Sequence, residues 1–218
     1  MPVRKIPKNY RNVTGISAHR KADGPAMFES TLERDFITLL EFNPTVETFE
    51  VQPLMLDWID PAGKSRRYTP DVLATFNLPH EHRGKTLYEV KYRDELRRDW
   101  QELRPKLRAA VHFARTQGWR FKIITEVEVR TPYLDNAKFL LPFMRQGPAE
   151  EAHMDLLDEQ LCRLHQSTPT DLLATVFQDE WNQARLLPTL WYLIGTRQIG
   201  ADLSTKLTMT SLIWSLHK

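Results

Sequence analysis

Two stretches of this 218-residue chain decide its fold: Arg67-Tyr-Thr-Pro-Asp-Val-Leu-Ala-Thr-Phe76 and Thr86-Leu-Tyr-Glu-Val-Lys-Tyr92. Both are rich in β-branched and aromatic residues, and a polar loop separates them. That pattern predicts two antiparallel strands joined as a hairpin. Pairing of the strands would bring Asp71 beside Glu89, which follows it by eighteen residues.

Charged side chains on these strands form a candidate site. Successive side chains of a strand alternate between its two faces, so Glu89 and Lys91 share one face and Val90 takes the other. Asp71 and Glu89 together would offer the oxygen ligands that Mg²⁺ or Mn²⁺ prefers. A cation would also relieve the repulsion between the two carboxylates. Lys91 would orient an attacking water or offset charge on a phosphate, which favours phosphodiester hydrolysis.

A motif this short also occurs by chance in proteins that have no such site. The alternative interpretation places Asp71 and Glu89 on an exposed strand surface, with Lys91 as a cross-strand partner. Charged residues are unusual in a buried sheet unless they are paired or bind a ligand. These ones are flanked by Val72, Leu73, Leu87 and Val90. The apolar flanks favour the nuclease interpretation.

The segments around the motif predict a mixed sheet with flanking helices. Ser30 stands three residues before Glu33, which is a capping-box pattern, and an apolar helical face follows until Asn43. Residues 46–54 and 56–60 have the composition of strands. Residues 93–118 repeat apolar side chains every three or four positions, and Pro105 is expected to kink or divide that helix. With a last strand at 121–125, the order predicts an α/β fold.

The remainder of the chain predicts a second, mostly helical domain. Residues 146–149 look like a linker, and helices are expected at 154–164, 170–177 and 185–194. A hairpin over residues 199–214 would follow, which is the order of a winged-helix domain. The predicted division is therefore a basic arm at 1–25, a nuclease domain at 26–145 and a winged-helix domain at 150–218.

Charge is distributed unevenly although the net charge is only +2. Residues 1–25 hold six basic side chains and one acidic one, whereas residues 150–218 hold five basic and nine acidic ones. The first segment is either a flexible arm attracted to phosphates or a solubilising tail, and charge alone does not separate the two. The acidic C-terminal part fits protein docking better than tight DNA binding. Candidate DNA contacts are Arg4, Lys5, Lys8, Arg11, Arg66 and Arg67.

Composition excludes several classes of protein. The hydrophobic and charged fractions, 41% and 27%, are those of a globular protein and not of a disordered or fibrous one. Cys162 is the only cysteine, so an intramolecular disulfide and a cysteine-based zinc site are excluded. No apolar run approaches the ~18 residues of a membrane helix, and no secretory signal opens the chain. These features predict a soluble, cytoplasmic protein.

Residues 28–125 resemble the catalytic domain of the TnsA endonuclease family, subunits of heteromeric bacterial transposases. The resemblance is carried by Ser30-Thr-Leu-Glu33-Arg-Asp-Phe, Val46-Glu-Thr-Phe-Glu-Val-Gln-Pro53-Leu, Tyr68-Thr-Pro-Asp71-Val-Leu and Tyr88-Glu89-Val-Lys91. It implies a restriction-endonuclease fold in which Glu33, Asp71 and Glu89 are catalytic and bind the metal. Lys91 would be the catalytic lysine, and Val90 would be a further metal-contacting position. Residues 150–218 are similar to that family's winged-helix domain.

The same resemblance implies an activity, a cofactor and partners. The activity would be Mg²⁺-dependent cleavage of the 5′ ends of a transposon, with Mn²⁺ able to substitute. Partners would be double-stranded DNA at the transposon ends, a TnsB-like DDE transposase and a TnsC-like AAA+ ATPase that meets the C-terminal domain. A free-standing restriction or repair nuclease of the same fold, and a non-catalytic DNA-bound assembly protein, remain the alternatives.

Overall fold

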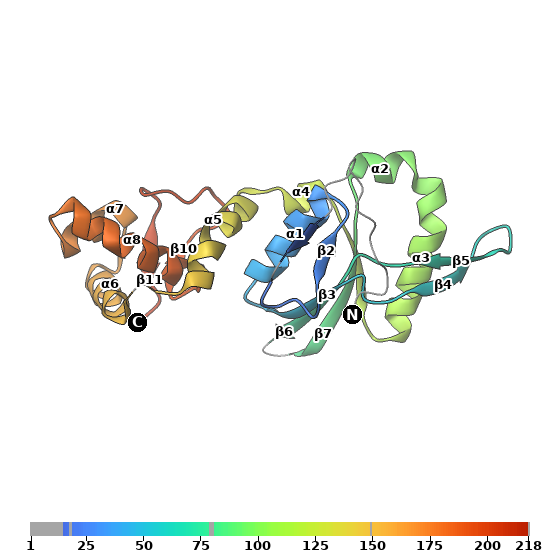
Figure 1. Cartoon of the computed structure of the whole chain (residues 1–218), viewed down its shortest axis with the longest axis horizontal. Helices are drawn as coiled ribbons and strands as arrows, with labels where there is room; N and C mark the ends of the chain where they lie inside the picture. Colours follow the sequence, from blue (N-terminus) through green and yellow to red (C-terminus); the bar gives the residue numbers. More distant parts are fainter. Residues whose placement is uncertain (1–14, 18, 79–80, 149, 218) are drawn as a thin grey trace. The chain divides into compact units, whose positions relative to one another are not determined.

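The computed structural model describes residues 15–17, 19–78, 81–148 and 150–217. The chain divides into two compact units, Met1–Arg130 and Thr131–Lys218. The first is a mixed α/β unit and the second is mostly helical with a small sheet (Figure 1). The fold class expected from the sequence is thereby confirmed. No helix in the described residues is long and apolar enough to cross a membrane.

A four-stranded sheet of order β3-β6-β7-β8 forms the centre of the first unit. Its strands are β3 (Val46–Val51), β6 (Val72–Leu78), β7 (Glu81–Val90) and β8 (Arg120–Ile124). β6 pairs antiparallel with both β3 and β7, as the hairpin pattern predicts, whereas β8 runs parallel to β7. A parallel neighbour requires a crossover connection, which α2 (Arg93–Arg98) and α3 (Trp100–Thr116) supply.

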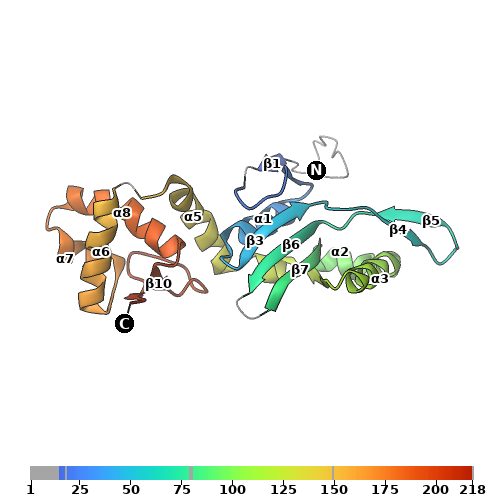
Figure 2. The same cartoon turned by 90° about the horizontal axis from the view of Figure 1, so that it is seen from below.

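Helices cover both faces of this sheet (Figures 1 and 2). α1 (Thr31–Phe42) begins at Ser30, whose hydroxyl accepts the N–H of Glu33, and it packs against β3, β7 and the short helix α4 (Glu126–Val129). α3 packs against β8 and against β4 (Leu56–Ile59). β4 pairs with β5 (Ser65–Tyr68) in a hairpin that projects from the sheet, and β1 (Gly15–Ser17) pairs with β2 (Ala26–Phe28).

One expected strand, and the expected division of a helix at Pro105, are wrong. Residues 67–76 do not form one strand, because β5 ends at Tyr68 and β6 begins at Val72. Pro70 lies in the gap, and proline has no N–H to donate to a strand ladder. Pro105 neither divides nor ends its helix: the break falls at Asp99, and Pro105 lies inside α3. α3 therefore lacks the one main-chain hydrogen bond that the N–H of this residue would have donated.

Part of the segment predicted as a basic arm is ordered beside the sheet. The N–H of Phe49 donates to the carbonyl of Lys21, and the N–H of Asp23 donates to the carbonyl of Phe49. The Lys21 ammonium donates to the carbonyl of Asn43, at 2.6 Å. Residues 21–23 therefore lie alongside β3 and are hydrogen-bonded to its main chain. They do not form a flexible arm. Arg4, Lys5, Lys8 and Arg11 lie outside the described residues.

The second unit contains four helices and a three-stranded sheet in its described residues. They are α5 (Pro132–Gln146), α6 (Glu151–Leu164), α7 (Pro169–Val176) and α8 (Glu180–Gly195), with β9 (Gln166–Ser167), β10 (Ile199–Ala201) and β11 (Ile213–Ser215) in the order β10-β11-β9. The last three helices and the closing hairpin were expected from the sequence, whereas β9 was not.

α5 lies on the C-terminal side of the division between the units, whereas the sequence placed the division at residues 146–149. The reason is packing: α5 lies against α8, where the rings of Phe139 and Trp191 meet edge to face at 5.1 Å. Leu140 and Leu141 are buried on the same helix. Gly147, with φ of 81°, ends α5 and turns the chain into α6.

Candidate active site

Asp71 is held against the end of β7 by main-chain contacts. It immediately precedes β6, and its N–H donates to the carbonyl of Tyr88 at 3.1 Å. Its Oδ2 accepts the N–H of Val90 at 2.7 Å. Among the described residues, Oδ1 has no hydrogen-bond partner. The carboxylate is therefore fixed at the strand end with one oxygen left for a ligand.

Glu89 is the most buried acidic side chain of the site, with 2% of its surface exposed. The hydroxyl of Tyr68 donates to its Oε2. Its Oε1 faces two ammonium groups, that of Lys106 at 3.6 Å and that of Lys91 at 4.0 Å. A charge buried to this extent is tolerated when it is paired and hydrogen-bonded, and here the pairing comes from three side chains.

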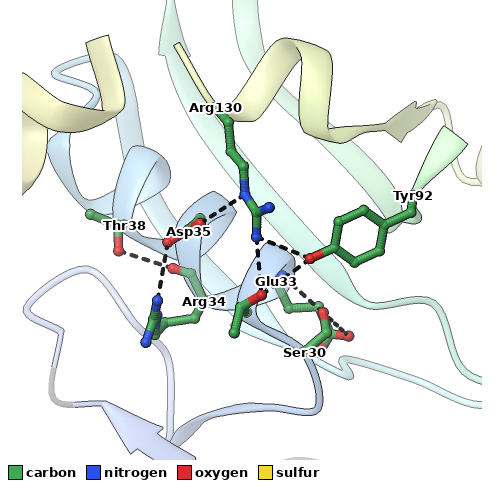
Figure 3. A network of polar contacts seen from close by, with 8 residues as sticks. Ser30, Glu33, Arg34, Asp35, Thr38, Tyr92 and Arg130 are labelled. Atoms are coloured by element: carbon green, nitrogen blue, oxygen red, sulfur yellow. Dashed lines mark hydrogen bonds and ion pairs between the residues drawn. The ribbon is translucent and has the colours of Figure 1, made fainter. Parts of the chain in front are cut away.

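Glu33 stands in the first turn of α1 and is also buried. Its Oε1 accepts the hydroxyl of Ser30 at 3.0 Å, and its Oε2 accepts the N–H of Glu29 at 2.8 Å. Figure 3 shows Ser30 and Glu33 at this helix start. The Ser30 hydroxyl thus both caps the helix and holds the Glu33 carboxylate.

Electrostatics couple these groups. The pKa of Asp71 is raised well above its ordinary value, first by burial and then by the charge of Glu89. Burial also raises the pKa of Glu33, against the hydrogen bonds from Glu29 and Ser30. Burial alone would lower the pKa of Lys91, but the charges of Asp71, Glu89 and Glu33 outweigh it and raise that pKa. The site is a group of mutually repelling carboxylates, with Lys91 attracted to all three of them and Lys106 paired with Glu89.

Carboxylate oxygens are the ligands that a hard divalent cation prefers. The carboxylates of this site do not, however, converge on a single position. In the described part of the chain, no three Asp, Glu, His or Cys side chains are arranged to hold a metal ion by themselves. The free Oδ1 of Asp71 and the raised pKa values of Asp71 and Glu33 are the features that a cation would relieve. Waters or substrate oxygens usually complete the coordination of Mg²⁺.

Comparison with protein families matches both units. Residues 43–126 match the model described as TnsA-like endonuclease N terminal, and residues 128–203 match the model described as TnsA endonuclease C terminal. The chain belongs to the TnsA endonuclease family. A comparison with curated proteins gave no match.

The TnsA family matches fit the structural division and part of the site. The second match begins at residue 128, near the start of the Thr131–Lys218 unit, so it includes α5. The first match includes Asp71, Glu89 and Lys91. Glu33 precedes the matched residues, and its place in the site is supported by its electrostatic coupling to Lys91.

A second polar network lies at the start of α1, the helix that carries Glu33 (Figure 3). The guanidinium of Arg130 donates to Asp35 at 3.3 Å, and to the hydroxyls of Thr31 and Tyr92 at 3.0 Å each. Tyr92 directly follows Lys91, and Thr31 opens α1. Arg130 therefore ties the end of the strand with Lys91 to the start of the helix with Glu33.

Sequence reasoning missed two partners of Glu89 in the candidate site, Tyr68 and Lys106. Tyr68 adjoins the Thr-Pro-Asp motif, so its position was a usable signal. Lys106 gave none, because it lies among many charged residues on α3. The proposed DNA contacts Arg66 and Arg67 lie on the hairpin of β4 and β5 and are exposed. Arg66 Nε donates to Asp60 at 3.0 Å.

Proposed function

We propose that this protein is the Mg²⁺-dependent DNA endonuclease subunit of a heteromeric transposase, and that it cuts the 5′ ends of a transposon. The observation that carries the proposal is the meeting of Asp71, Glu89 and Lys91 at the ends of two paired strands, inside residues 43–126 that match a TnsA-like endonuclease. Membership of the TnsA family supports the place of this activity in transposition.

Each group of the site has a role that its surroundings support. Asp71, Glu33 and Glu89 would hold the divalent cation, with Val90 beside Asp71. A bound cation supplies a nucleophilic water at neutral pH and neutralises charge on the phosphate. Lys91 remains protonated, because neighbouring carboxylates raise its pKa, so it acts as a fixed positive charge toward the scissile phosphate. Tyr68 and Lys106 hold the Glu89 carboxylate in one orientation.

DNA would reach the site along the hairpin of β4 and β5. Arg67 on this hairpin is exposed, as are Lys64 and Arg66. Basic side chains on a projecting element can contact phosphates and position the duplex without reading its sequence. Arg4, Lys5, Lys8 and Arg11 would add sequence-independent attraction.

Partners would be a TnsB-like DDE transposase and a TnsC-like AAA+ ATPase, the latter meeting the C-terminal unit. Family membership implies DNA and transposase partners. Residues 150–218 are acidic overall, which disfavours phosphate binding. On α8 of this unit Trp181 is 82% exposed, and exposed tryptophans are enriched at protein interfaces. These features support a docking role.

Cleavage by the Asp71→Ala variant tests the proposal. Donor DNA with both transposon ends is incubated with the partner subunits and Mg²⁺, and strand breaks are mapped at each end. Loss of a metal ligand removes several kcal/mol of transition-state stabilisation, so 5′-end cleavage should fall by several powers of ten. Cleavage at the 3′ ends by the partner should continue.

Glu102→Ala is the matched control, since Glu102 is an exposed carboxylate on α3. It should cut at the rate of the unmodified protein. Retention of 5′-end cleavage by the Asp71→Ala variant would refute the assignment of the site.

A further inference from the structure

Gln52 has a main-chain conformation that glutamine rarely adopts. It follows the last residue of β3, and its φ is 50°, in the left-handed region. The next residue is Pro53, whose ring further restricts the conformations open to Gln52. Such conformations persist only where the surrounding structure imposes them, and they concentrate at functional sites.

The main chain of Gln52 is hydrogen-bonded to the main chain of Asp71. Its N–H donates to the carbonyl of Asp71 at 2.8 Å. This bond joins the end of β3 to the start of β6, so the conformation of Gln52 and the position of Asp71 depend on each other. The strained residue therefore belongs structurally to the candidate site.

The side chain of Gln52 reaches the other acidic part of the site. Its Nε2 donates to Oε1 of Glu29 at 3.3 Å, and the N–H of Glu29 donates to Oε2 of Glu33 at 2.8 Å. Gln52 thus contacts the Asp71 segment through its main chain and the segment before Glu33 through its carboxamide. No other residue in the described ranges has both of these hydrogen bonds.

One polar atom of Gln52 is left unsatisfied. The residue is only 6% exposed, and its Oε1 is buried with no hydrogen-bond donor among the described residues. A buried acceptor without a partner is costly, and native structures usually assign it a water, an ion or a catalytic role. A purely structural residue here would be better served by glycine, which accepts positive φ without strain.

We propose that Gln52 is a further residue of the metal-binding site. Its Nε2 positions Glu29, and its Oε1 accepts a hydrogen bond from a water molecule that the divalent cation brings into the site. This assignment rests on the proposed function, because it requires that the carboxylates around Asp71 bind a divalent cation. A group that hydrogen-bonds a metal ligand, as Oε1 would bond this water, typically changes metal affinity 10–100-fold when it is removed.

The test measures binding of Mn²⁺ alone to the full-length protein by titration calorimetry. Gln52→Met keeps the length of the side chain but removes both polar atoms, and Gln52→Gly removes the side chain while relieving the strain of positive φ. Thr189→Val is the matched control, because Thr189 Oγ1 is another buried atom with no hydrogen-bond partner in the described chain but lies on α8 of the second unit.

Both Gln52 variants should bind Mn²⁺ about tenfold or more weakly, and Thr189→Val should bind it as the unmodified protein does. If Gln52→Met does not fold, Gln52→Gly gives the answer alone. Unchanged Mn²⁺ affinity in a folded Gln52 variant would overturn this assignment and leave the proposed function intact. Failure of the unmodified protein to bind Mn²⁺ would instead refute the metal site of the proposed function, and this assignment with it.

Discussion

Glu89 has more protein partners than the other acidic side chains of the candidate site. Tyr68 donates to one of its oxygens, while Lys91 and Lys106 face the other. The negative charges of Asp71, Glu89 and Glu33 raise the pKa of Lys91 against the effect of its burial. At the scale of single residues, this environment supports the proposed role of Lys91 toward the phosphate, whereas Lys106 is proposed to hold Glu89.

Lys91→Ala should reduce the rate of 5′-end cleavage by about 10²–10³-fold, the usual loss when a charge-stabilising group is removed. DNA assembly should change little, since one charge is a small part of a large interface. Lys91→Arg should rescue poorly, because a planar guanidinium does not replace a compact ammonium. Single-turnover cleavage and gel-shift titration measure the two effects.

Lys106→Ala is the comparison, and it should reduce the rate less, since Lys91 still faces Glu89. Equal losses of cleavage rate and DNA affinity in the Lys91→Ala variant would mean that Lys91 is only a phosphate anchor.

Asp71→Asn should stabilise the metal-free protein, and more so at pH 8 than at pH 4. The folded state raises the pKa of Asp71 through burial and the charge of Glu89. A raised pKa contributes stability that is present at low pH and is lost as pH rises through the folded-state value. Asparagine removes that loss and keeps an oxygen for the N–H of Val90. Urea unfolding with a chelator at both pH values measures the effect, and a less stable variant at pH 8 would contradict it.

The hairpin of β4 and β5 has one face in the core and one face in solvent. Leu56 and Tyr68 are partners in the register and pack with Ala110 of α3. Because strand side chains alternate, Asp57, Ile59 and Arg67 take the opposite face, where Ile59 is 72% exposed. At the scale of elements, the packed face fixes the hairpin and leaves the other face free for a ligand.

Arg67→Ala should weaken DNA binding and reduce the slope of log K against log salt by about 0.9, the value of one phosphate contact. Arg66→Ala should change the slope less, because Asp60 already pairs with Arg66. Affinity titrations at several salt concentrations measure these slopes. Arg163→Ala is the control, since Arg163 pairs with Glu159 on α6. An unchanged slope for Arg67→Ala would exclude the hairpin as a phosphate contact.

Two compact units divide the whole molecule at Arg130 and Thr131. Arg130 belongs with the first unit, since it binds Asp35 on α1. α5 belongs with the second unit, since its buried residues pack against α8. A cut between the two residues therefore keeps α5 together with α8, against which it packs.

Residues 1–130 should accordingly fold as a soluble domain. Residues 1–148 should aggregate or melt less cooperatively, because α5 would expose Leu140 and Leu141 without α8. Size-exclusion chromatography and thermal melts of the two fragments test this expectation. A well-folded 1–148 fragment beside an unfolded 1–130 fragment would place α5 with the first unit.

Much of the fold followed from patterns that operate over a few residues. Ser30 caps α1 because a hydroxyl accepts an N–H three residues on. The pairing of β6 with β7 places Asp71 against the end of β7. Hairpin pairing and side-chain alternation depend on sequence over a short range, so this placement could be predicted. The resemblance to the TnsA endonuclease family could also be recognised from the sequence, because the motifs of that family are short stretches of sequence.

What the tertiary structure alone decided involves residues far apart in the chain. Lys106 reaches Glu89 only because the crossover brings α3 over the sheet, and Arg130 binds Asp35 across 95 residues. α5 belongs to the second unit because its apolar face packs against α8. Gln52, with its positive φ, donates its N–H to the carbonyl of Asp71, a residue that directly precedes another strand. Local patterns specify helices and strands, but the partners of a buried charge depend on how those elements pack.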